Sequence, residues 1–239
     1  MQKAIRIGAL VAVIGLLVGL VVYNILNPPA PDNSVWNAAM SKGDTETAKH
    51  HFVMYTDIFC PYCDKFSNAI AANLDKWEKD YIERENVLFE IRVTDINYRN
   101  GHSNNSRPAG IAAYCAARQN KFWDYYYALL AQMFEDYHSK GIGVDPYSQH
   151  IPDLPNSYFT DVAKDIEFDQ DSFKQCVDNQ ETLSELNKNT AKAEKNLNGS
   201  GIPHFVFDKF VYDGFAGNWD TTHDYEQVKT LMNAGLSTK

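Results

Sequence analysis

The chain has 239 residues, 44% hydrophobic and 22% charged, so it can bury a sizeable core and is unlike a disordered or fibrous protein. Its formal net charge is −9 and it contains no basic run that could line phosphates, which argues against a nucleic-acid-binding protein. Four cysteines are too few for a fold built on disulfides, but their even number allows one reactive pair and one structural bridge.

An apolar run from Ile7 to Leu26 follows Lys3 and Arg6. A helix of this length spans roughly 30 Å, the thickness of a bilayer core. The run ends without the small-x-small site of a cleaved signal, so we expect residues 1–26 to be a retained single-pass anchor, with cleavage as the alternative. Because the basic residues precede the run, the N-terminus is expected in the cytoplasm and the remainder outside it, where disulfides persist.

Residues 27–47 are rich in Pro, Asn, Ser, Asp and Gly and predict a linker between membrane and domain. The domain is expected over 48–239. Its core would comprise 48–100 and 199–239, and 101–198 would form a helical insertion.

The first half of the core predicts a strand, a helix and a second strand. The apolar run 52–55 favours a buried strand, and helical spacing predicts a helix that continues from Cys63 to about Arg84. Over 87–93 apolar residues alternate with Glu90 and Arg92, which predicts a strand with one polar side. Two strands separated by a helix indicate a parallel crossover.

The rest of the chain interrupts and then resumes this sheet pattern. Helices are expected over 108–119, 121–136, 158–166, 171–179 and 182–197, with a Gly- and Pro-rich loop over 139–157. Strand patterns return over 204–207 and 210–212, too close together for a crossover helix, and predict a hairpin. A final amphipathic helix is expected over 222–234. The fold class is therefore α/β.

The motif Cys60-Pro61-Tyr62-Cys63 lies where the first strand passes into a helix. Free N–H groups and the helix dipole favour an anion at a helix N-terminus, and so a thiolate at Cys60. Pro61 suits the first helical position, where its missing N–H costs nothing. The spacing of the two cysteines fits a dithiol/disulfide redox centre.

Zinc sites share this cysteine spacing, and His50 and His51 could complete a set of four ligands. Alternation along a strand would point the two histidines apart, so we expect no metal. The chain contains no Gly-rich phosphate loop, and we expect no cofactor.

These segments, over about residues 51–236, resemble the DsbA-like branch of the thioredoxin superfamily, which comprises extracytoplasmic thiol/disulfide oxidoreductases. Residues 55–63 are similar to the redox-motif stretch of that family. Residues 112–117 and 121–123 look like its inserted helices, and Gly201-Ile202-Pro203 is similar to its cis-proline loop. The resemblance implies a thioredoxin-like fold with a helical insertion.

The resemblance also implies roles for the motif residues. Cys60 would be the exposed nucleophile that forms a mixed disulfide with the substrate, and Cys63 would resolve it. Pro61 and Tyr62 would tune the stability of the thiolate. Many relatives carry a buried acid where this chain has Met54, so proton transfer to Cys63 would use water or Asp57 instead.

Three residues of the second part of the core are candidates for active-site support. Pro203, if cis, would face the sulfurs and expose a backbone edge to an extended substrate; an ordinary strand-opening proline is the alternative. Ile202 slightly favours a reductase, since thioredoxin-like reductases often carry isoleucine there. His204 would stabilise the thiolate as an imidazolium, or would be a solvated residue at a strand start.

Cys115 and Cys176 lie on different predicted helices of the insertion. Outside the cytoplasm a structural disulfide is favoured, with two buried thiols as the alternative.

We predict a membrane-anchored extracytoplasmic thiol/disulfide oxidoreductase that oxidises cysteine pairs in exported proteins or peptides and is reoxidised by a membrane redox partner. A reductase or isomerase of the same fold is the first alternative. A non-catalytic peptide-binding module, with the cysteines incidental, is the second.

Overall fold

The computed structural model describes residues 34–145, 147–197, 199–212 and 225–237, together with 14–16, 18–19 and 22. The chain separates into two units, Met1–Asp32 and Asn33–Lys239. The predicted anchor over 1–26 lies almost entirely outside the described residues. Among the residues that are described, none of the helices has both the length and the apolar character needed to cross a membrane.

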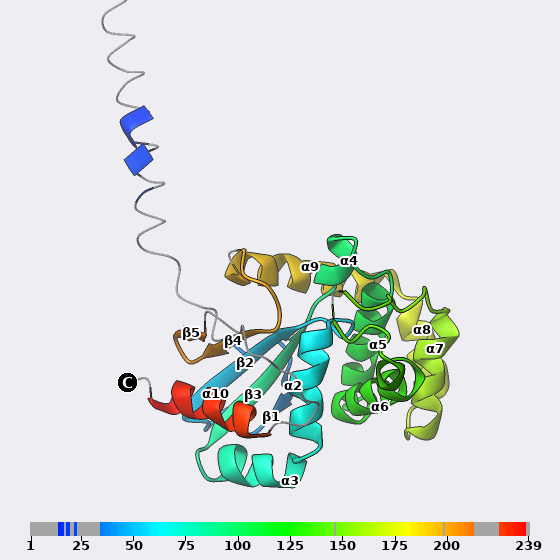
Figure 1. The fold of residues 1–239 in the computed structure, drawn as a ribbon, viewed down its shortest axis with the longest axis horizontal. Helices are drawn as coiled ribbons and strands as arrows, with labels where there is room; N and C mark the ends of the chain where they lie inside the picture. Colours follow the sequence, from blue (N-terminus) through cyan, green and yellow to red (C-terminus); the bar gives the residue numbers. More distant parts are fainter. Residues whose placement is uncertain are drawn as a thin grey trace, which may run out of the picture. The chain divides into compact units, whose positions relative to one another are not determined.

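The described part of the second unit contains one sheet of five strands in the order β1-β3-β2-β4-β5 (Figure 1). The strands are β1 Ser41–Lys42, β2 His50–Thr56, β3 Val87–Val93, β4 His204–Phe207 and β5 Phe210–Tyr212. β2 and β3 run parallel, which confirms the predicted crossover. β4 and β5 form the predicted antiparallel hairpin, and β4 also pairs antiparallel with β2.

The connection between β2 and β3 consists of three short helices instead of the predicted single one. They are α2 Pro61–Ala71, α3 Leu74–Trp77 and a π-helical segment Glu78–Glu83. Asn73 separates the first two, and its side chain donates a hydrogen bond to the Ala69 carbonyl at 3.0 Å. This polar break lets the chain turn before Trp77, which is fully buried.

Helices cover both faces of the sheet (Figure 1). α2 and α10 (Tyr225–Ser237) pack on the face that buries Phe52, Met54 and Phe205. α9 (Gln180–Leu197) packs on the other face, against a cluster of Val53, Tyr55 and Val206. Neighbouring residues of a strand point to opposite faces, so consecutive residues of β2 supply both layers of the core.

The insertion is helical, as predicted. The short helix α4 Ile96–Arg99 precedes it. The elements of the insertion are α5 Ser106–Arg118, α6 Phe122–Asp136, the 3-10 helix His138–Lys140, α7 Asn156–Asp161, the 3-10 helix Val162–Asp165, α8 Gln170–Val177 and α9. A disulfide joins Cys115 of α5 to Cys176 of α8, which confirms the expected bridge. The two cysteines are 61 positions apart, and closing a loop of that length is worth about 4 kcal/mol in the chain-entropy model.

Part of the predicted linker over 27–47 belongs to the folded domain, so that prediction is wrong for residues 34–42. The 3-10 helix Ala38–Met40 leads into β1, which pairs with β3. The Glu90 carboxylate accepts a hydrogen bond from the Trp36 N–H at 2.6 Å, and Arg92 donates to the Ser34 carbonyl at 2.6 Å. Composition alone did not reveal these contacts because they depend on buried partners in β3.

β3 has no exposed side, in contrast to its sequence pattern. Glu90 and Arg92 are buried and form an ion pair at 2.9 Å, and Arg92 also donates to the Tyr55 hydroxyl at 2.7 Å. Burial by itself would raise the pKa of Glu90, but hydrogen bonds from His51 and Arg92 hold that pKa below its ordinary value. The charges are tolerated inside the domain because each has a partner.

Candidate active site

The turn between β2 and α2 is built around Asp57. Its Oδ1 accepts a hydrogen bond from the Phe59 N–H and its Oδ2 accepts one from the Asn97 N–H, each at 2.9 Å. The Cys60 N–H donates to the Asp57 carbonyl at 3.0 Å and closes the turn. Asp57 is buried, and burial raises the pKa of its carboxyl to about 7. The two hydrogen bonds that the carboxyl accepts fix the turn that presents Cys60, and the role of Asp57 in proton transfer stays a prediction.

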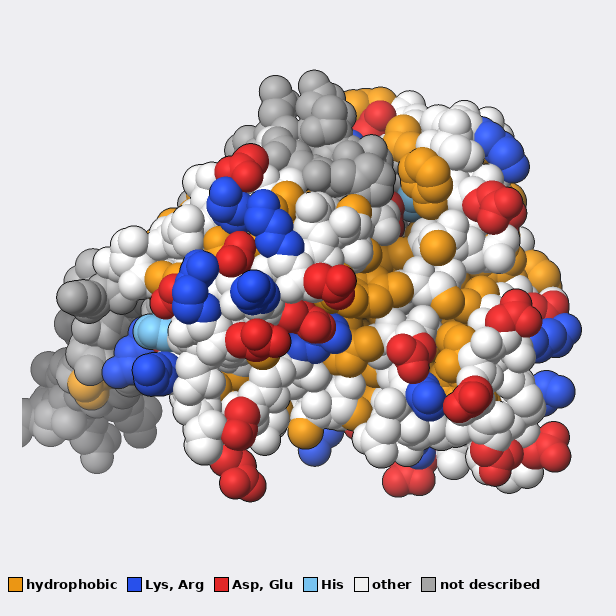
Figure 2. Space-filling model, turned by 90° about the horizontal axis from the view of Figure 1, so that it is seen from below, with side chains coloured by type: hydrophobic (Ala, Val, Ile, Leu, Met, Phe, Trp, Pro, Cys, Tyr) orange, Lys and Arg blue, Asp and Glu red, His pale blue; other side chains and the backbone are white. Residues whose placement is uncertain are grey.

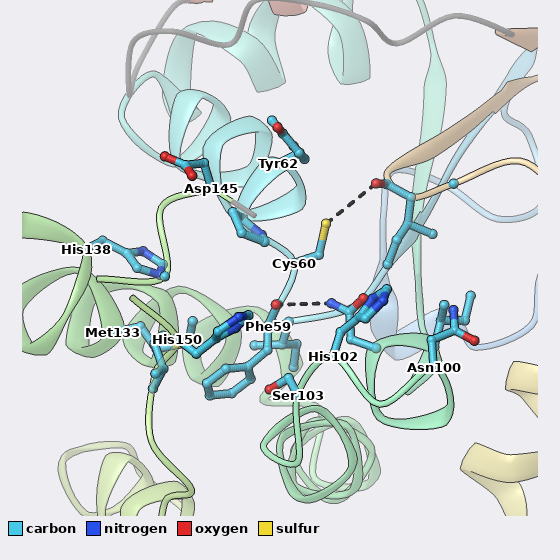
Figure 3. A pocket seen from close by; sticks show the side chains of 18 of the residues that line it. Phe59, Cys60, Tyr62, Asn100, His102, Ser103, Met133, His138, Asp145 and His150 are labelled. Carbon is cyan, nitrogen blue, oxygen red and sulfur yellow. Dashed lines mark hydrogen bonds between the residues drawn. The ribbon is translucent and has the colours of Figure 1, made fainter. Parts of the chain in front are cut away.

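Cys60 is the N-cap of α2, with Pro61 at the first helical position, as the sequence predicts. Its Sγ accepts a hydrogen bond from the Cys63 N–H at 3.4 Å. Its Sγ also lies 3.6 Å from the Ile202 carbonyl, to which it donates (Figure 3). The side chain is 5% exposed, so the prediction of an exposed nucleophile is wrong. The Ile202 carbonyl contacts the sulfur, and Cys60 lines a cleft.

Cys63 lies one turn deeper in α2 and is buried; both cysteines are free thiols. Burial raises the pKa of the Cys63 thiol well above its ordinary value, and the neighbouring Cys60 raises it further. The Thr56 hydroxyl and the Asp57 N–H act in the opposite direction. Cys63 is therefore held as a thiol, while Cys60 has the helix N-terminal N–H at its sulfur and is suited to nucleophilic attack.

The peptide bond between Ile202 and Pro203 is cis, as predicted. Pro203 is buried directly before β4, and Ile202 turns its carbonyl towards Cys60. The structure therefore brings the two separate sequence motifs together.

His204 does not face the cysteines and is only 4% exposed, so both readings are wrong: it neither stabilises the Cys60 thiolate nor is a solvated residue at a strand start. It pairs with Tyr55 of β2, and the two rings lie 5.9 Å apart. The next residue, Phe205, packs on Phe66 of α2. Since neighbouring strand residues alternate between faces, His204 points away from α2.

A cleft of about 560 Å³ opens beside Cys60 (Figure 3). Pro61 and Tyr62 form part of its wall next to the sulfur, and Ile202 lies across from them. Apolar side chains from the redox turn, α4, α6 and the 141–151 loop line part of it, and polar side chains line other parts: Ile58, Phe59, Ile96, Met133 and Ile151 are the apolar ones. The cleft can therefore hold an apolar segment of another molecule against the thiol.

Three histidines, His102, His138 and His150, also line the cleft and were not identified from the sequence. His150 lies in the predicted Gly- and Pro-rich loop over 139–157, and His102 and His138 lie between predicted elements. The sequence signal that could have drawn attention to them is the presence of three histidines in the insertion; their convergence depends on its fold.

The zinc alternative is not supported by the described residues, among which no group of three or more candidate ligands could hold a metal. His50 Nδ1 lies 2.8 Å from an Asp208 carboxylate oxygen, whereas His51 Nε2 lies 3.1 Å from Glu90. The two histidines thus have separate acidic partners.

Comparisons with solved structures agree with this fold. The structure is similar to BdbD from Bacillus subtilis, with a TM-score of 0.58 and 19% identity, covering 87% of this chain and 98% of that one. It is similar to MdbA, a thiol-disulfide oxidoreductase from Corynebacterium diphtheriae, with a TM-score of 0.57 and 17% identity over 87% and 97% of the two chains. The catalytic domain of Proteus mirabilis ScsC gives a TM-score of 0.54 and 19% identity over 86% and 94%.

Curated protein sequences yield no match to the chain. A family model described as Thioredoxin matches residues 37–234, which include both the Cys60 motif and the Pro203 loop. The matched segment also contains the whole helical insertion, so the insertion is part of the family's domain in this chain. By this match the chain belongs to the thioredoxin family.

Proposed function

We propose that the protein is an extracytoplasmic thiol/disulfide oxidoreductase that oxidises cysteine pairs in exported proteins through a Cys60–Cys63 disulfide. The observation that carries this proposal is the free cysteine pair at the start of α2. The Cys60 Sγ lies 3.6 Å from the Ile202 carbonyl, and both residues line a cleft. The fold shared with solved thiol-disulfide oxidoreductases supports it.

In the oxidising direction, a substrate thiolate attacks the Cys60 sulfur of the disulfide. The Cys60–Cys63 bond breaks, and Cys63 leaves as a thiolate that takes up a proton, which its raised pKa favours. A second substrate thiolate then attacks the substrate sulfur of the mixed disulfide and releases the Cys60 thiolate. The substrate loses two electrons to the pair, and a membrane redox partner accepts them to restore the disulfide.

A reductase or isomerase of the same fold is the second candidate, favoured by Ile202 before the cis-proline. The equilibrium of the full-length protein with glutathione distinguishes the directions. An oxidase is expected to have a reduction potential well above about −220 mV and to oxidise a reduced two-cysteine peptide stoichiometrically. A potential near about −270 mV, with faster reduction of insulin than oxidation of the peptide, would instead establish a reductase.

The partner is proposed to be a protein or peptide and not a nucleic acid. On the face shown in Figure 2, acidic and basic side chains are interspersed and hydrophobic side chains gather in a strip between them. The overall charge of −9 also disfavours phosphate binding. An apolar strip with a mixed polar rim suits a protein surface.

Residues 1–26 are proposed to be a retained anchor, with the N-terminus in the cytoplasm. The apolar run after Lys3 and Arg6 supports this topology. Fractionated cells are expected to hold the protein in membranes, resistant to carbonate extraction, with an intact mass that includes the run. A mature chain that begins after Leu26 would contradict the anchor.

A further inference from the structure

A buried contact between a carboxylate and a histidine joins the redox helix to the insertion. Asp64 follows Cys63 in the first turn of α2, and its Oδ2 lies 2.9 Å from Nδ1 of His138. The two side chains are only 5% and 6% exposed. Asn68 donates to the other carboxylate oxygen at 2.9 Å. Both oxygens of Asp64 therefore have fixed partners.

Asp64 is also tied to Cys60 through the backbone. Its N–H donates to the Cys60 carbonyl at 3.0 Å, the hydrogen bond that starts α2. Residues four apart share a face of a helix, so the Asp64 carboxylate lies about one turn from the end where a thiolate would form. A carboxylate there repels that thiolate and competes with it for the positive end of the helix dipole.

His138 begins the 3-10 helix after α6 and lines the cleft that contains Cys60 (Figure 3). When protonated, its imidazole offsets the Asp64 charge at short range in a site where water screens little. We infer that His138 is a positioning residue for thiol exchange: through Asp64 it fixes the first turn of α2 and offsets a charge that opposes the Cys60 thiolate. This inference rests on the proposed function of Cys60 as the attacking thiol.

Other titratable groups face the pair from the neighbouring elements. Asp145 and His150 of the 141–151 loop line the same cleft, and Asp145 lies on the same side of it as His138 (Figure 3). The Asp145 carboxylate accepts hydrogen bonds from the N–H groups of its own turn, Tyr147 at 2.7 Å among them. On α6, burial raises the pKa of Tyr126, and the Asp64 charge adds to that shift. Of the titratable groups here, His138 is the one whose ring contacts the Asp64 carboxylate, so it is the group placed to offset that charge.

The test is the pH dependence of Cys60 alkylation by iodoacetamide in the reduced full-length protein. His138→Gln is expected to move the midpoint of the alkylation rate against pH to higher pH. At a given pH below that midpoint, the ratio of Cys60 thiolate to thiol should fall by about threefold to tenfold. Asp64→Asn is expected to move it to lower pH. The double variant should return close to the wild type, because both charges are then absent.

His50→Gln is the matched control, since it changes a histidine at the start of β2 whose acidic partner is Asp208 and which does not line the cleft, and its midpoint should equal that of the wild type. His138→Lys retains a positive charge and should stay within about twofold of the wild-type ratio. If His138→Gln does not fold, the midpoints of His138→Lys and Asp64→Asn test the inference instead. Unchanged midpoints in folded His138→Gln and Asp64→Asn, or shifts in the same direction, would show a merely structural pair.

The alkylation assay requires no protein substrate, so it separates this inference from the proposed function. The midpoints of His138→Gln and Asp64→Asn could shift in opposite directions while the wild type exchanges no disulfide with a peptide. That result would overturn the proposed function but support the effect of His138 on Cys60. Active exchange without any shift would retain the function and overturn the role of His138.

Discussion

Cys63→Ala is expected to trap substrates as mixed disulfides with Cys60 in cells. In this variant Cys60 can still attack a substrate disulfide, which is the reverse of the proposed oxidation, and form a mixed disulfide by displacing one substrate thiolate. No Cys63 thiol is then present to attack the Cys60 sulfur and release the substrate. Turnover of a disulfide substrate should fall by about a thousandfold or more, as when part of a covalent catalytic unit is removed. Complexes would appear on non-reducing gels, disappear on reduction, and be identified by mass spectrometry.

Cys60→Ala is the matched control and should capture nothing, because Cys63 is buried beneath it. Both variants retain the Cys115–Cys176 disulfide, so their stabilities should be similar. Failure of Cys63→Ala to capture any thiol protein, together with normal peptide binding, would favour the non-catalytic binding module.

Asp57→Asn is expected to remove a large pH dependence of folding stability. The Asp57 carboxyl has a pKa of about 7 in the folded protein and an ordinary value of 3.8. As the pH rises between these values, the unfolded chain releases the Asp57 proton while the folded protein keeps it. The contribution of protonated Asp57 to the free energy of unfolding therefore falls. It is fully present below pH 3.8 and lost once the pH passes 7.

The difference in unfolding free energy between the wild type and Asp57→Asn should therefore fall by about 4 kcal/mol from pH 4 to pH 8. Urea unfolding at several pH values measures it. Asp124→Asn is the matched control, because the Asp124 side chain is 62% exposed and should leave the slope unchanged. Parallel stability curves for the wild type and Asp57→Asn would show that Asp57 is ionised throughout.

Local sequence patterns predicted much of the fold. The alternation and short spacing of the last two strands were sufficient for the β4–β5 hairpin, and helical spacing located the helices of the insertion. The Cys60 motif could be placed at a helix start from the apolar run before it. The cis bond at Pro203 and the Cys115–Cys176 bridge came from the family resemblance and the expected compartment, and both are confirmed.

What the sequence did not reveal depends on contacts between distant segments. The alternation over 87–93 predicts a polar side with Glu90 and Arg92 but not what covers it. Residues 34–37 and the Tyr55 hydroxyl supply that cover. The direction of His204 follows from its pairing with β2, which no local pattern specifies. His138 meets Asp64 only when the insertion folds back over α2, 74 positions further along the chain (138 − 64).

The ribosome synthesises the Cys60 motif long before the Ile202 loop that contacts it. Cys60 and the Ile202 carbonyl that contacts its sulfur are separated by 142 positions. At about 5–20 residues per second, a ribosome adds Ile202 roughly 7–30 s after Cys60. During this interval the nascent chain carries both thiols of the motif but has neither β4 nor the loop that contacts Cys60. Any oxidant or chaperone that acts on the emerging chain therefore meets a more accessible cysteine than the folded protein presents.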